Sequence, residues 1–365
     1  MRAASCLIAA LSLGACQYVQ TALDYGRGPF DESARNPTQS VYLGMNESSW
    51  DSGRFDAGTL LVTNKRGNDL SIVDLATGRE IRRVPTCINP HELAVSPDGR
   101  HVALGCYGGT TVDILSASTF EKVASIDLGE NARPHGIVWH SGNAIFVTAE
   151  GRKSIFRITG ALSDTPELSE FKTGQEGSHM LAVSPDARTV WTTDLGSKTV
   201  TRVNLDDAAD VRTVTVGEEP EGISLSPDGT ALWVSARGSN QAIKLDPVTM
   251  EVRKTLETGR FPLRLAVRPQ GDVAVTSNLA DGTLSVIDIA RGEVIRTIRV
   301  SNPNAARERF QVTILWSGDG ARIYVAETGN DTVAEVDYSS GTVLRHFKVG
   351  DGGDGLAIIA PLDAP

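Results

Sequence analysis

Three of the six histidines lie at regular intervals, because His91, His135 and His179 are each 44 residues apart. Each begins an apolar stretch with the character of a β-strand, and Glu221 begins another such stretch 42 residues later. If the stretches are copies of one unit arranged around an axis, the imidazoles and the carboxylate meet at one place. Three imidazoles with a free fourth position form a catalytic type of metal site that suits zinc, copper, iron or nickel. Neutral imidazoles can instead transfer protons near pH 7.

Further polar residues are expected near these histidines. In the remaining copies the matching position holds Leu263, then Val312 or its neighbour Gln311, and finally Gly355. Acidic, basic and phenolic side chains come from two further places, the loops after the second strand of a unit and the residue after the matching position. These side chains could bind a carboxylate or lactone and move a proton. The expected catalytic residues are His91, His135, His179 and Glu150, and the expected ligand-binding residues are Tyr107, Glu221, Arg237, Arg264 and Gln311.

A structural explanation for these residues stands beside the functional one. A histidine at the start of a strand can simply cap it, and Pro90-His91 and Pro134-His135 can be copies of one duplicated segment. Charged residues at loop tips are commonly only solvated. The pattern therefore predicts a site without deciding between a divalent metal ion, an organic ligand and a capping role.

The elements that would position these residues are repeats of one unit. In its clearest copy, PHELAVSPDG at 90–99, an apolar run leads into a Ser-Pro-Asp-Gly turn. Aligned on Ser96, the copies recur at positions 96, 140, 184, 226, 268, 317 and 360, with a period near 44 residues. Each unit holds four strand-like runs with alternating apolar residues, such as HELAV, VALGC, TVDIL and EKVASIDL. Four antiparallel strands at this period predict an all-β, seven-bladed β-propeller over residues 56–365.

The way the repeats begin and end predicts how the ring closes. The first strand-like run, LLVTN at 60–64, is a second strand of the unit, and the last, LAIIA at 356–360, is a first strand. The C-terminal strand is therefore expected to complete the blade begun by the three N-terminal strands, which leaves no open seam. One spacing of 49 residues indicates an insertion at 301–310, expected as a longer loop beside the site.

A family resemblance rests on LLVTN, on NDLSIVDLATGREI at 68–81 and on the Ser-Pro-Asp-Gly turns. These motifs resemble the Tyr-Val-Thr-Asn (YVTN) repeat propellers of exported bacterial proteins, over about residues 56–365. That family includes binding proteins, surface proteins and subunits of redox enzymes, and similar seven-bladed scaffolds occur in lactone-cleaving and lactone-forming enzymes. The resemblance implies the architecture and leaves the function open.

The N-terminus predicts export. Met1-Arg2 precedes a short apolar stretch that ends in Leu13-Gly14-Ala15-Cys16, which resembles a bacterial lipobox. Residues 1–15 are expected to be a lipoprotein signal peptide and Cys16 to carry the lipid, while Gln17, by resemblance to sorting rules, favours the outer membrane. The alternative is an ordinary signal peptide with a chance cysteine. Residues 16–55 are polar and rich in turn formers, which predicts a tether, so membrane contact is expected through the lipid alone.

Cys87 and Cys106 are the cysteines that remain after the N-terminal segment. If Pro97-Asp98-Gly99 closes a hairpin, the ends of its two strands lie side by side and bring these cysteines together. An oxidising compartment then favours a disulfide over a cysteine-based metal site.

Charge and missing motifs narrow the classes of function. The formal net charge is −10 and no run of Lys or Arg occurs, which argues against a nucleic-acid partner. The sequence lacks a Gly-x-Ser-x-Gly elbow, a phosphate-binding loop, a dinucleotide fingerprint and a haem-attachment motif. The expected function is binding of a small ligand or divalent metal ion at the histidine-rich mouth, with lyase, isomerase or lactonase chemistry as an extension. The alternatives are a non-catalytic envelope scaffold for a protein partner and a subunit of a periplasmic redox enzyme.

Overall fold

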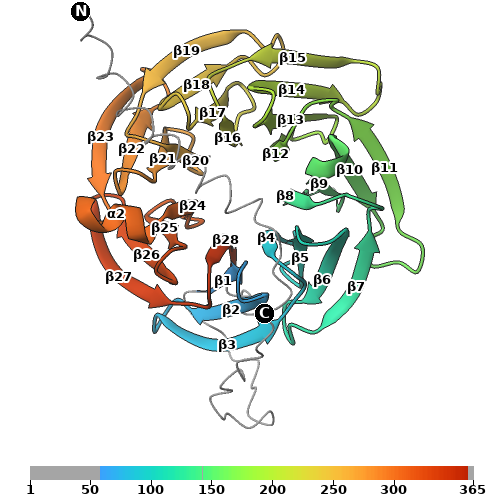
Figure 1. Cartoon of the computed structure of the whole chain (residues 1–365), viewed down its shortest axis with the longest axis horizontal. Helices are drawn as coiled ribbons and strands as arrows, with labels where there is room; N and C mark the ends of the chain where they lie inside the picture. Colours follow the sequence, from blue (N-terminus) through green and yellow to red (C-terminus); the bar gives the residue numbers. More distant parts are fainter. Residues whose placement is uncertain (1–57, 142, 361–365) are drawn as a thin grey trace, which may run out of the picture. The chain divides into compact units, whose positions relative to one another are not determined.

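Seven four-stranded antiparallel sheets form a ring around a central axis (Figure 1). The computed structural model describes residues 58–141 and 143–360. The all-β, seven-bladed propeller expected from the repeats is confirmed. The expected signal peptide, the tether and Cys16 lie outside the described residues and stay predictions.

Within each blade the strands follow one another from the axis to the rim (Figure 1). Blade by blade, the strands are β28(Gly353–Ile359), β1(Thr59–Asn64), β2(Asp69–Asp74) and β3(Arg79–Pro85); β4(Pro90–Val95), β5(His101–Cys106), β6(Thr111–Ser116) and β7(Lys122–Asp127); β8(Pro134–Trp139), β9(Ile145–Ala149), β10(Ser154–Thr159) and β11(Glu167–Lys172); β12(Ser178–Val183), β13(Thr189–Asp194), β14(Thr199–Asn204) and β15(Val211–Thr215); β16(Pro220–Leu225), β17(Leu232–Ala236), β18(Gln241–Leu245) and β19(Val252–Glu257); β20(Pro262–Val267), β21(Val273–Asn278), β22(Thr283–Asp288) and β23(Glu293–Arg299); and β24(Gln311–Trp316), β25(Arg322–Glu327), β26(Thr332–Asp337) and β27(Thr342–Lys348).

The ring closes where the sequence predicts. β28 pairs antiparallel with β1, in a register that sets Ala357 opposite Leu61. The C-terminal strand thus takes the innermost place in a blade whose other three strands are N-terminal. This pairing covers the inner edge of β1, which would otherwise be open to another chain.

The Ser-Pro-Asp-Gly segments form turns, as expected. Between β4 and β5, Gly99 N–H donates to the carbonyl oxygen of Ser96 at 2.9 Å, and the Ser96 hydroxyl donates to Asp98 at 2.6 Å. Gly99 has a φ of +70°, a conformation that glycine adopts without a steric penalty. The turn reverses the chain, so the start of β4 and the end of β5 lie on the same face of the ring.

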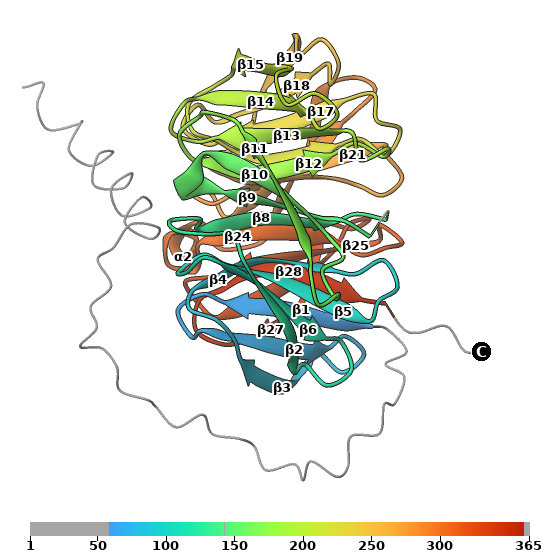
Figure 2. The ribbon, with the colours of Figure 1, turned by 90° about the vertical axis from the view of Figure 1, so that its right-hand side faces the viewer.

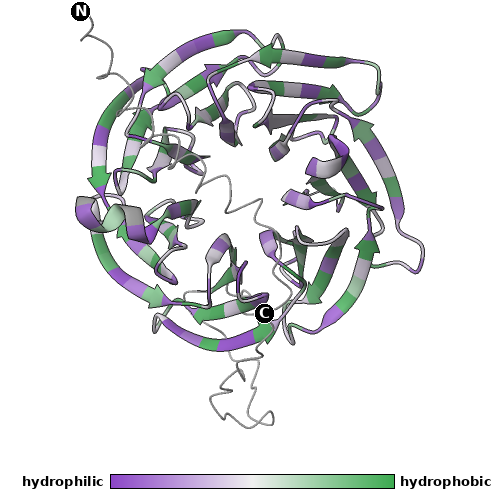
Figure 3. Ribbon diagram, viewed as in Figure 1, coloured by the Kyte–Doolittle hydropathy of each residue, from purple (hydrophilic) through white to green (hydrophobic). Residues whose placement is uncertain are grey.

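Adjacent blades pack face to face through apolar side chains. In one such core, Val112 and Ile114 of β6 pack with Ile145 and Val147 of β9, and all four are fully buried. The outer strands carry hydrophobic and hydrophilic residues in turn around the rim (Figure 3), and β7 and β19 each bury one residue. Figure 3 also shows hydrophilic segments at the inner ends of several first strands.

Every first strand has a β-bulge near its start. In β8, Pro134 pairs with Ala149 and Ile137 pairs with Val147, so His135 and Gly136 together face Thr148. The other six first strands show the same shift of register. A bulge changes the direction in which the side chains beside it point. All seven bulges lie at the end where the first strands begin, on the face of the ring that carries helix α2(Pro303–Arg309) (Figure 2).

Helix α2 corrects one expectation, because residues 301–310 were expected to form a loop. Asn302 caps this helix by accepting from Asn304 N at 3.0 Å, and Pro303 occupies the first turn, where a missing N–H costs nothing. The Asn302-Pro303 pair is the signal in the sequence for the start of this helix. No helix in the described part of the chain is long and apolar enough to cross a membrane.

The predicted disulfide between Cys87 and Cys106 is present, with Cα atoms 5.7 Å apart. It joins the segment that leads into β4 to the last residue of β5. The bond therefore holds the segment just before His91 next to the segment just before Tyr107.

Candidate functional site

One position in each first strand supplies the side chains at the mouth of the channel. In each blade, one residue of the first strand pairs with the last residue of the second strand, and the next residue of the first strand is what we call the mouth position. In β8, for example, Pro134 pairs with Ala149, and His135 follows it. Around the ring the mouth position holds His91, His135, His179, Glu221, Leu263, Val312 and Asp354.

One expected assignment changes, and one that the sequence left open is decided. In the blade closed by β28 the mouth position holds Asp354 and not Gly355, because Gly353 pairs with Asn64 and the bulge follows it. In the blade begun by β24 it holds Val312, because Gln311 itself pairs with Glu327. Gln311, expected to bind a ligand, is fully buried, and its amide donates to Ser301 at 2.9 Å. This contact places Gln311 against the segment that leads into α2.

The three mouth histidines form a row of rings across neighbouring blades. The ring centroids of His135 and His179 are 3.8 Å apart, and those of His91 and His135 are 4.7 Å apart. Tyr107 extends the row, with its centroid 4.4 Å from that of His91. His91 and His135 are buried, and the side chain of His179 is 14 % exposed. The structure thus brings together the residues that the repeat spacing singled out.

A glycine allows the closest of these approaches. A Cβ atom on Gly136 would lie 2.8 Å from the carbonyl oxygen of His179 and 3.0 Å from the Cα atom of Met180. The missing side chain lets β8 and β12 come close enough for their histidine rings to stack.

Glu150 joins the row of rings from the loop after β9. It is the first residue of the short 3₁₀ helix η3(Glu150–Arg152), and its Oε1 contacts Nδ1 of His179. Its Oε2 accepts from the Tyr107 hydroxyl at 2.8 Å, and Arg133 donates to that hydroxyl oxygen. Both oxygens of Glu150 are therefore held by residues of the neighbouring blades.

Glu221 lies at the other nitrogen of His179, with Oε1 3.4 Å from Nε2. Arg237 and Arg264 both donate to the Glu221 carboxylate. Burial alone would raise the pKa of Glu221, but the two arginines hold it below its usual value. The arginines expected to clamp an anionic ligand are thus already paired with a carboxylate of the protein.

One ion pair spans the channel beside this group. Arg264 of β20 donates to Glu92 Oε1 of β4 at 2.9 Å, although these strands belong to blades that are not neighbours (Figure 1). Both side chains are buried. Burial raises the pKa of Glu92, and Arg264 opposes that shift. The pair ties opposite parts of the ring together next to the histidines.

The last blade contributes Asp354 beside His91. Asp354 Oδ2 accepts from Lys65 Nζ at 3.1 Å and lies 3.9 Å from His91 Nε2. His91 Nδ1 lies 3.3 Å from the carbonyl oxygen of Asn89, which favours a proton on Nδ1. Asp354 Oδ1 is buried without a hydrogen-bond partner among the described residues. This side of the mouth therefore presents one acceptor atom, Asp354 Oδ1, that a ligand or water molecule can satisfy.

Burial and neighbouring charges together shift the pKa values of the histidines. It lowers the pKa of His91 to about 4, with Lys65 adding to the shift, and it lowers the pKa of His135 well below the usual value. Burial would also lower the pKa of His179, but Glu150 and Glu221 outweigh it and raise that pKa. Burial would raise the pKa of Glu150, but His179 holds it below the usual value. Two imidazoles of the row are therefore neutral at pH 7, and the third lies between two carboxylates.

Three of these side chains have the geometry to hold a metal ion. One ligand atom each from His135, Glu150 and His179 lies within 4.8 Å of the others. His91 is not part of this group, so the geometry gives two histidines and a carboxylate in place of the expected three histidines. In the described part of the chain a second group consists of Cys87, Cys106 and Asp113, but its two sulfur atoms are joined in the disulfide.

Four residues of the mouth were not identified as site residues from the sequence. They are Lys65, Glu92, Arg133 and Asp354. A signal for Glu92 was available, because Glu92 and Arg264 both directly follow a mouth position. Asp354 required the register of the last strand.

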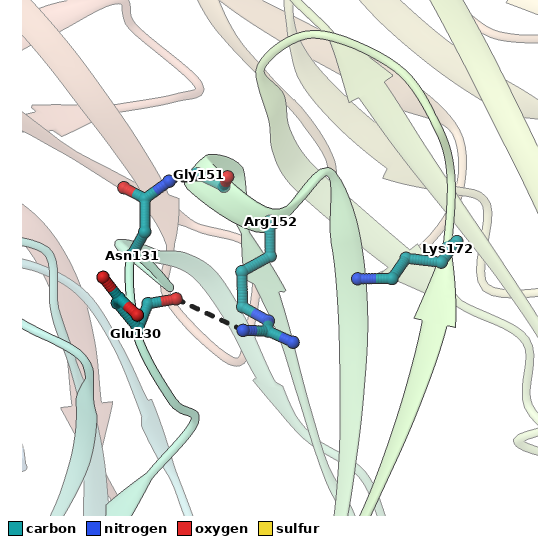
Figure 4. A pocket seen from close by; sticks show the side chains of 5 residues that line it. All are labelled: Glu130, Asn131, Gly151, Arg152 and Lys172. Atoms are coloured by element: carbon teal, nitrogen blue, oxygen red, sulfur yellow. Dashed lines mark hydrogen bonds between the residues drawn. The ribbon is translucent and has the colours of Figure 1, made fainter.

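A separate pocket lies at η3, which contributes Gly151 and Arg152 to its lining. It has a volume of about 350 Å³ and is lined by Glu130, Asn131, Gly151, Arg152 and Lys172 (Figure 4). Arg152 donates to the carbonyl oxygen of Glu130 at 3.2 Å, and both cations of the pocket pair with Glu170, at 2.9 Å and 2.6 Å. Its cations are thus neutralised within the protein, which makes the pocket a weaker candidate than the mouth.

Comparison with known proteins supports the fold. No protein-family model and no curated protein match the chain. Hydrazine synthase from Kuenenia stuttgartiensis superposes with a TM-score of 0.67 at 16 % identity, over 81 % of this chain and 99 % of that chain. A protein of unknown function from Desulfotomaculum acetoxidans gives a TM-score of 0.65 at 14 % identity, over 84 % of this chain and 100 % of that chain. Virginiamycin B lyase from Staphylococcus aureus gives 0.61 at 14 % identity, over 74 % and 92 %. At these identities the likeness shows that the chain shares the β-propeller fold, on which unrelated activities occur.

Proposed function

We propose that this protein binds a divalent metal ion of the zinc type at the mouth of its propeller, through His135, Glu150 and His179. One observation carries the proposal: ligand atoms of these three residues lie within 4.8 Å of one another. Imidazole nitrogen and carboxylate oxygen are ligands of zinc, and three protein ligands leave a position for water or a substrate.

The surroundings of the three residues support a metal site. Glu221 lies 3.4 Å from His179 Nε2, so His179 can coordinate through Nδ1 while its other N–H stays on a carboxylate. Metal-binding histidines almost always have such a partner. Tyr107 holds the second oxygen of Glu150 at 2.8 Å. His135 is a neutral imidazole whose buried Nδ1 has no hydrogen-bond partner among the described residues.

The ligand class that fits the mouth is a small molecule with a carbonyl or carboxylate oxygen. A divalent ion supplies Lewis-acid chemistry, because it polarises such an oxygen or makes a bound water more acidic. His91, Lys65 and Asp354, next to His135, offer hydrogen-bonding groups to the rest of the ligand. Lyase, isomerase or lactonase chemistry would follow from this arrangement, and virginiamycin B lyase is an example of a lyase on a similar fold.

A second candidate needs no metal. The contact of His179 Nδ1 with Glu150 and the Tyr107–Glu150 hydrogen bond make a short chain of proton-exchanging groups. Such a chain could serve general acid–base catalysis on a ligand in the mouth. It becomes the leading candidate if the purified protein has no affinity for metal ions.

We also propose that the protein is exported to the cell envelope, anchored through Cys16. The Cys87–Cys106 disulfide supports an oxidising compartment. Intact-mass measurement of the full chain from membranes tests this: a diacylglycerol-modified Cys16 as the first residue supports it, and an unmodified N-terminus contradicts it.

Metal binding is tested by elemental analysis and by titration of chelator-treated protein with Zn²⁺ and Co²⁺. We expect one ion per chain. His135→Gln and Glu150→Gln each remove a ligand, so each should lose most of the affinity, whereas the matched control His91→Gln should retain it. Absence of binding by the unaltered protein, or equal loss in the control, contradicts the proposed ligand set.

A further inference from the structure

Thr148 contacts the backbone at two of the proposed metal ligands. It lies in β9, two residues before Glu150, and is fully buried. Its hydroxyl oxygen accepts from Gly136 N at 2.9 Å, and the hydroxyl donates to the carbonyl oxygen of His179 at 2.6 Å. Since Gly136 directly follows His135, one hydroxyl group links the strands of both histidines to the strand that leads to Glu150.

We infer that Thr148 is the positioning residue of the metal site and sets the spacing of His135, Glu150 and His179. The inference rests on the proposed function, because it concerns the geometry of that site. Thr148 acts through the backbone and provides no ligand atom itself.

The same kind of link occurs elsewhere in the ring. In several blades the second-to-last residue of the second strand is Thr or Ser. Its hydroxyl donates to the backbone carbonyl oxygen of the residue at the mouth position of the next blade. Such links run from Thr63 to His91, from Thr193 to Glu221 at 2.7 Å, from Ser235 to Leu263 at 3.1 Å and from Ser277 to Val312 at 2.8 Å. Each joins two blades, but among these residues Thr148 is the one that links two strands bearing proposed ligands.

His135 depends on Thr148 for a further reason. In the blade before it, the position equivalent to Thr148 is Gly105, which has no hydroxyl to hold the carbonyl oxygen of His135. A Cβ atom on Gly105 would lie 3.0 Å from that oxygen, so the strand packs there without a side-chain link. The hydrogen bond from Gly136 N to Thr148 therefore holds the backbone next to His135, just as the hydrogen bond from Thr148 to the carbonyl oxygen holds the backbone of His179.

Small displacements matter at such a site. A metal site functions when its groups are held within about 0.5 Å of the required geometry. Loss of groups that orient metal ligands typically lowers affinity about 10- to 100-fold. Without the hydroxyl, β8 stays paired with β9 in their sheet but loses the contact at its bulge, and β12 loses its side-chain link to β9. The two imidazoles can then move apart.

The test compares Thr148→Val with Thr148→Ser and with Ser277→Ala. The first removes the hydroxyl and keeps the shape, the second restores the hydroxyl, and the third removes the equivalent link in a blade without a proposed ligand. We expect Co²⁺ affinity to fall about 10- to 100-fold in Thr148→Val, with an altered visible spectrum of the bound ion. Thr148→Ser should bind Co²⁺ as the unaltered protein does. Ser277→Ala should lose thermal stability but keep its affinity.

Equal Co²⁺ affinities in Thr148→Val and Ser277→Ala would overturn the role of Thr148 and leave the metal site intact. If the unaltered protein binds no metal, the proposed function fails, and the positioning role is then judged on metal-free protein. Long-range ¹H–¹⁵N NMR of the histidine side chains provides that measurement. Displaced His135 and His179 signals in Thr148→Val, but not in Ser277→Ala, support the positioning role, and unchanged signals reject it.

Discussion

His135 is the residue whose environment most needs an explanation. It is 2 % exposed, its pKa is well below the usual value because of burial, and its Nδ1 has no hydrogen-bond partner among the described residues. A buried polar atom without a partner costs about 1–3 kcal/mol. A capping role would pair this nitrogen with the backbone, whereas a metal ion or a ligand would satisfy it only when bound. The residue therefore favours a binding role over a structural one.

Glu221 gives the first prediction at this scale, because it orients His179 without belonging to the ligand set. Glu221→Gln should weaken Zn²⁺ binding about 10- to 100-fold, since a neutral amide holds the His179 N–H less strongly. Competition with a chromophoric chelator measures the affinity. Glu219→Gln is the matched control, because Glu219 also pairs with Arg237, at 3.2 Å, whereas Glu221 contacts both Arg237 and His179. The same loss in both variants would show that the arginine, and not the histidine, carries the effect.

Asp194 provides a pH prediction away from the mouth. Burial raises its pKa to about 6, although the hydroxyls of Thr201, Thr192, Ser178 and Thr199 oppose the shift. The folded protein therefore binds a proton more tightly than the unfolded chain, and this group destabilises the fold above pH 6 but not below about pH 4. The cost at neutral pH is about 3 kcal/mol, because the pKa of about 6 lies well above the ordinary value of an aspartate.

Asp194→Asn removes this dependence. The stability of the unaltered protein, relative to the variant, should rise as the pH falls from 7 to 4, by up to about 3 kcal/mol. Urea unfolding of both proteins at several pH values gives the difference between their free energies of unfolding. The contributions of other titrating groups cancel in this difference. A difference that stays constant with pH would contradict the raised pKa.

At the scale of elements, the first strands show how far the sequence could predict the site. The spacing predicted that His91, His135 and His179 meet, because each unit begins its first strand in the same way. It did not find Asp354, because a bulge decides which residue of the last strand takes the mouth position, and the apolar pattern does not mark bulges. It also could not find the Glu92–Arg264 pair, since repeat spacing orders the blades without saying which side chains meet across the ring.

The approach of β8 and β12 gives a prediction that belongs to these elements. Gly136→Ala would place a Cβ atom 2.8 Å from the carbonyl oxygen of His179, so the two strands must separate. Overpacking of this kind costs about 1–3 kcal/mol, and we expect metal affinity to fall about tenfold or more. Thermal unfolding and Co²⁺ titration measure the two effects. Gly318→Ala is the control, because a Cβ atom there meets no atom within 4 Å. Unchanged affinity in Gly136→Ala would mean that the ligands tolerate this separation.

At the scale of the whole molecule, closure of the ring completes the mouth. Lys65 follows the first described strand and Asp354 lies in the last, yet their side chains meet at 3.1 Å beside His91. The Glu92–Arg264 pair joins two further blades across the channel. Residues distant in sequence thus reach the mouth only when all seven blades are in place, so the site should be sensitive to loss of any blade strand.

Removal of β28 tests this dependence. A chain that ends at residue 352 loses Asp354 and the buried Leu356 and Ala357, and it leaves the inner edge of β1 without a partner. An open edge of this kind pairs readily with another chain, so we expect self-association in size-exclusion chromatography, a lower unfolding temperature and weaker Co²⁺ binding. The control ends at residue 360 and keeps β28, so it should behave as the full chain does. A monomeric β28 deletion with unchanged unfolding temperature and Co²⁺ affinity would show that the other six blades hold the mouth together without closure.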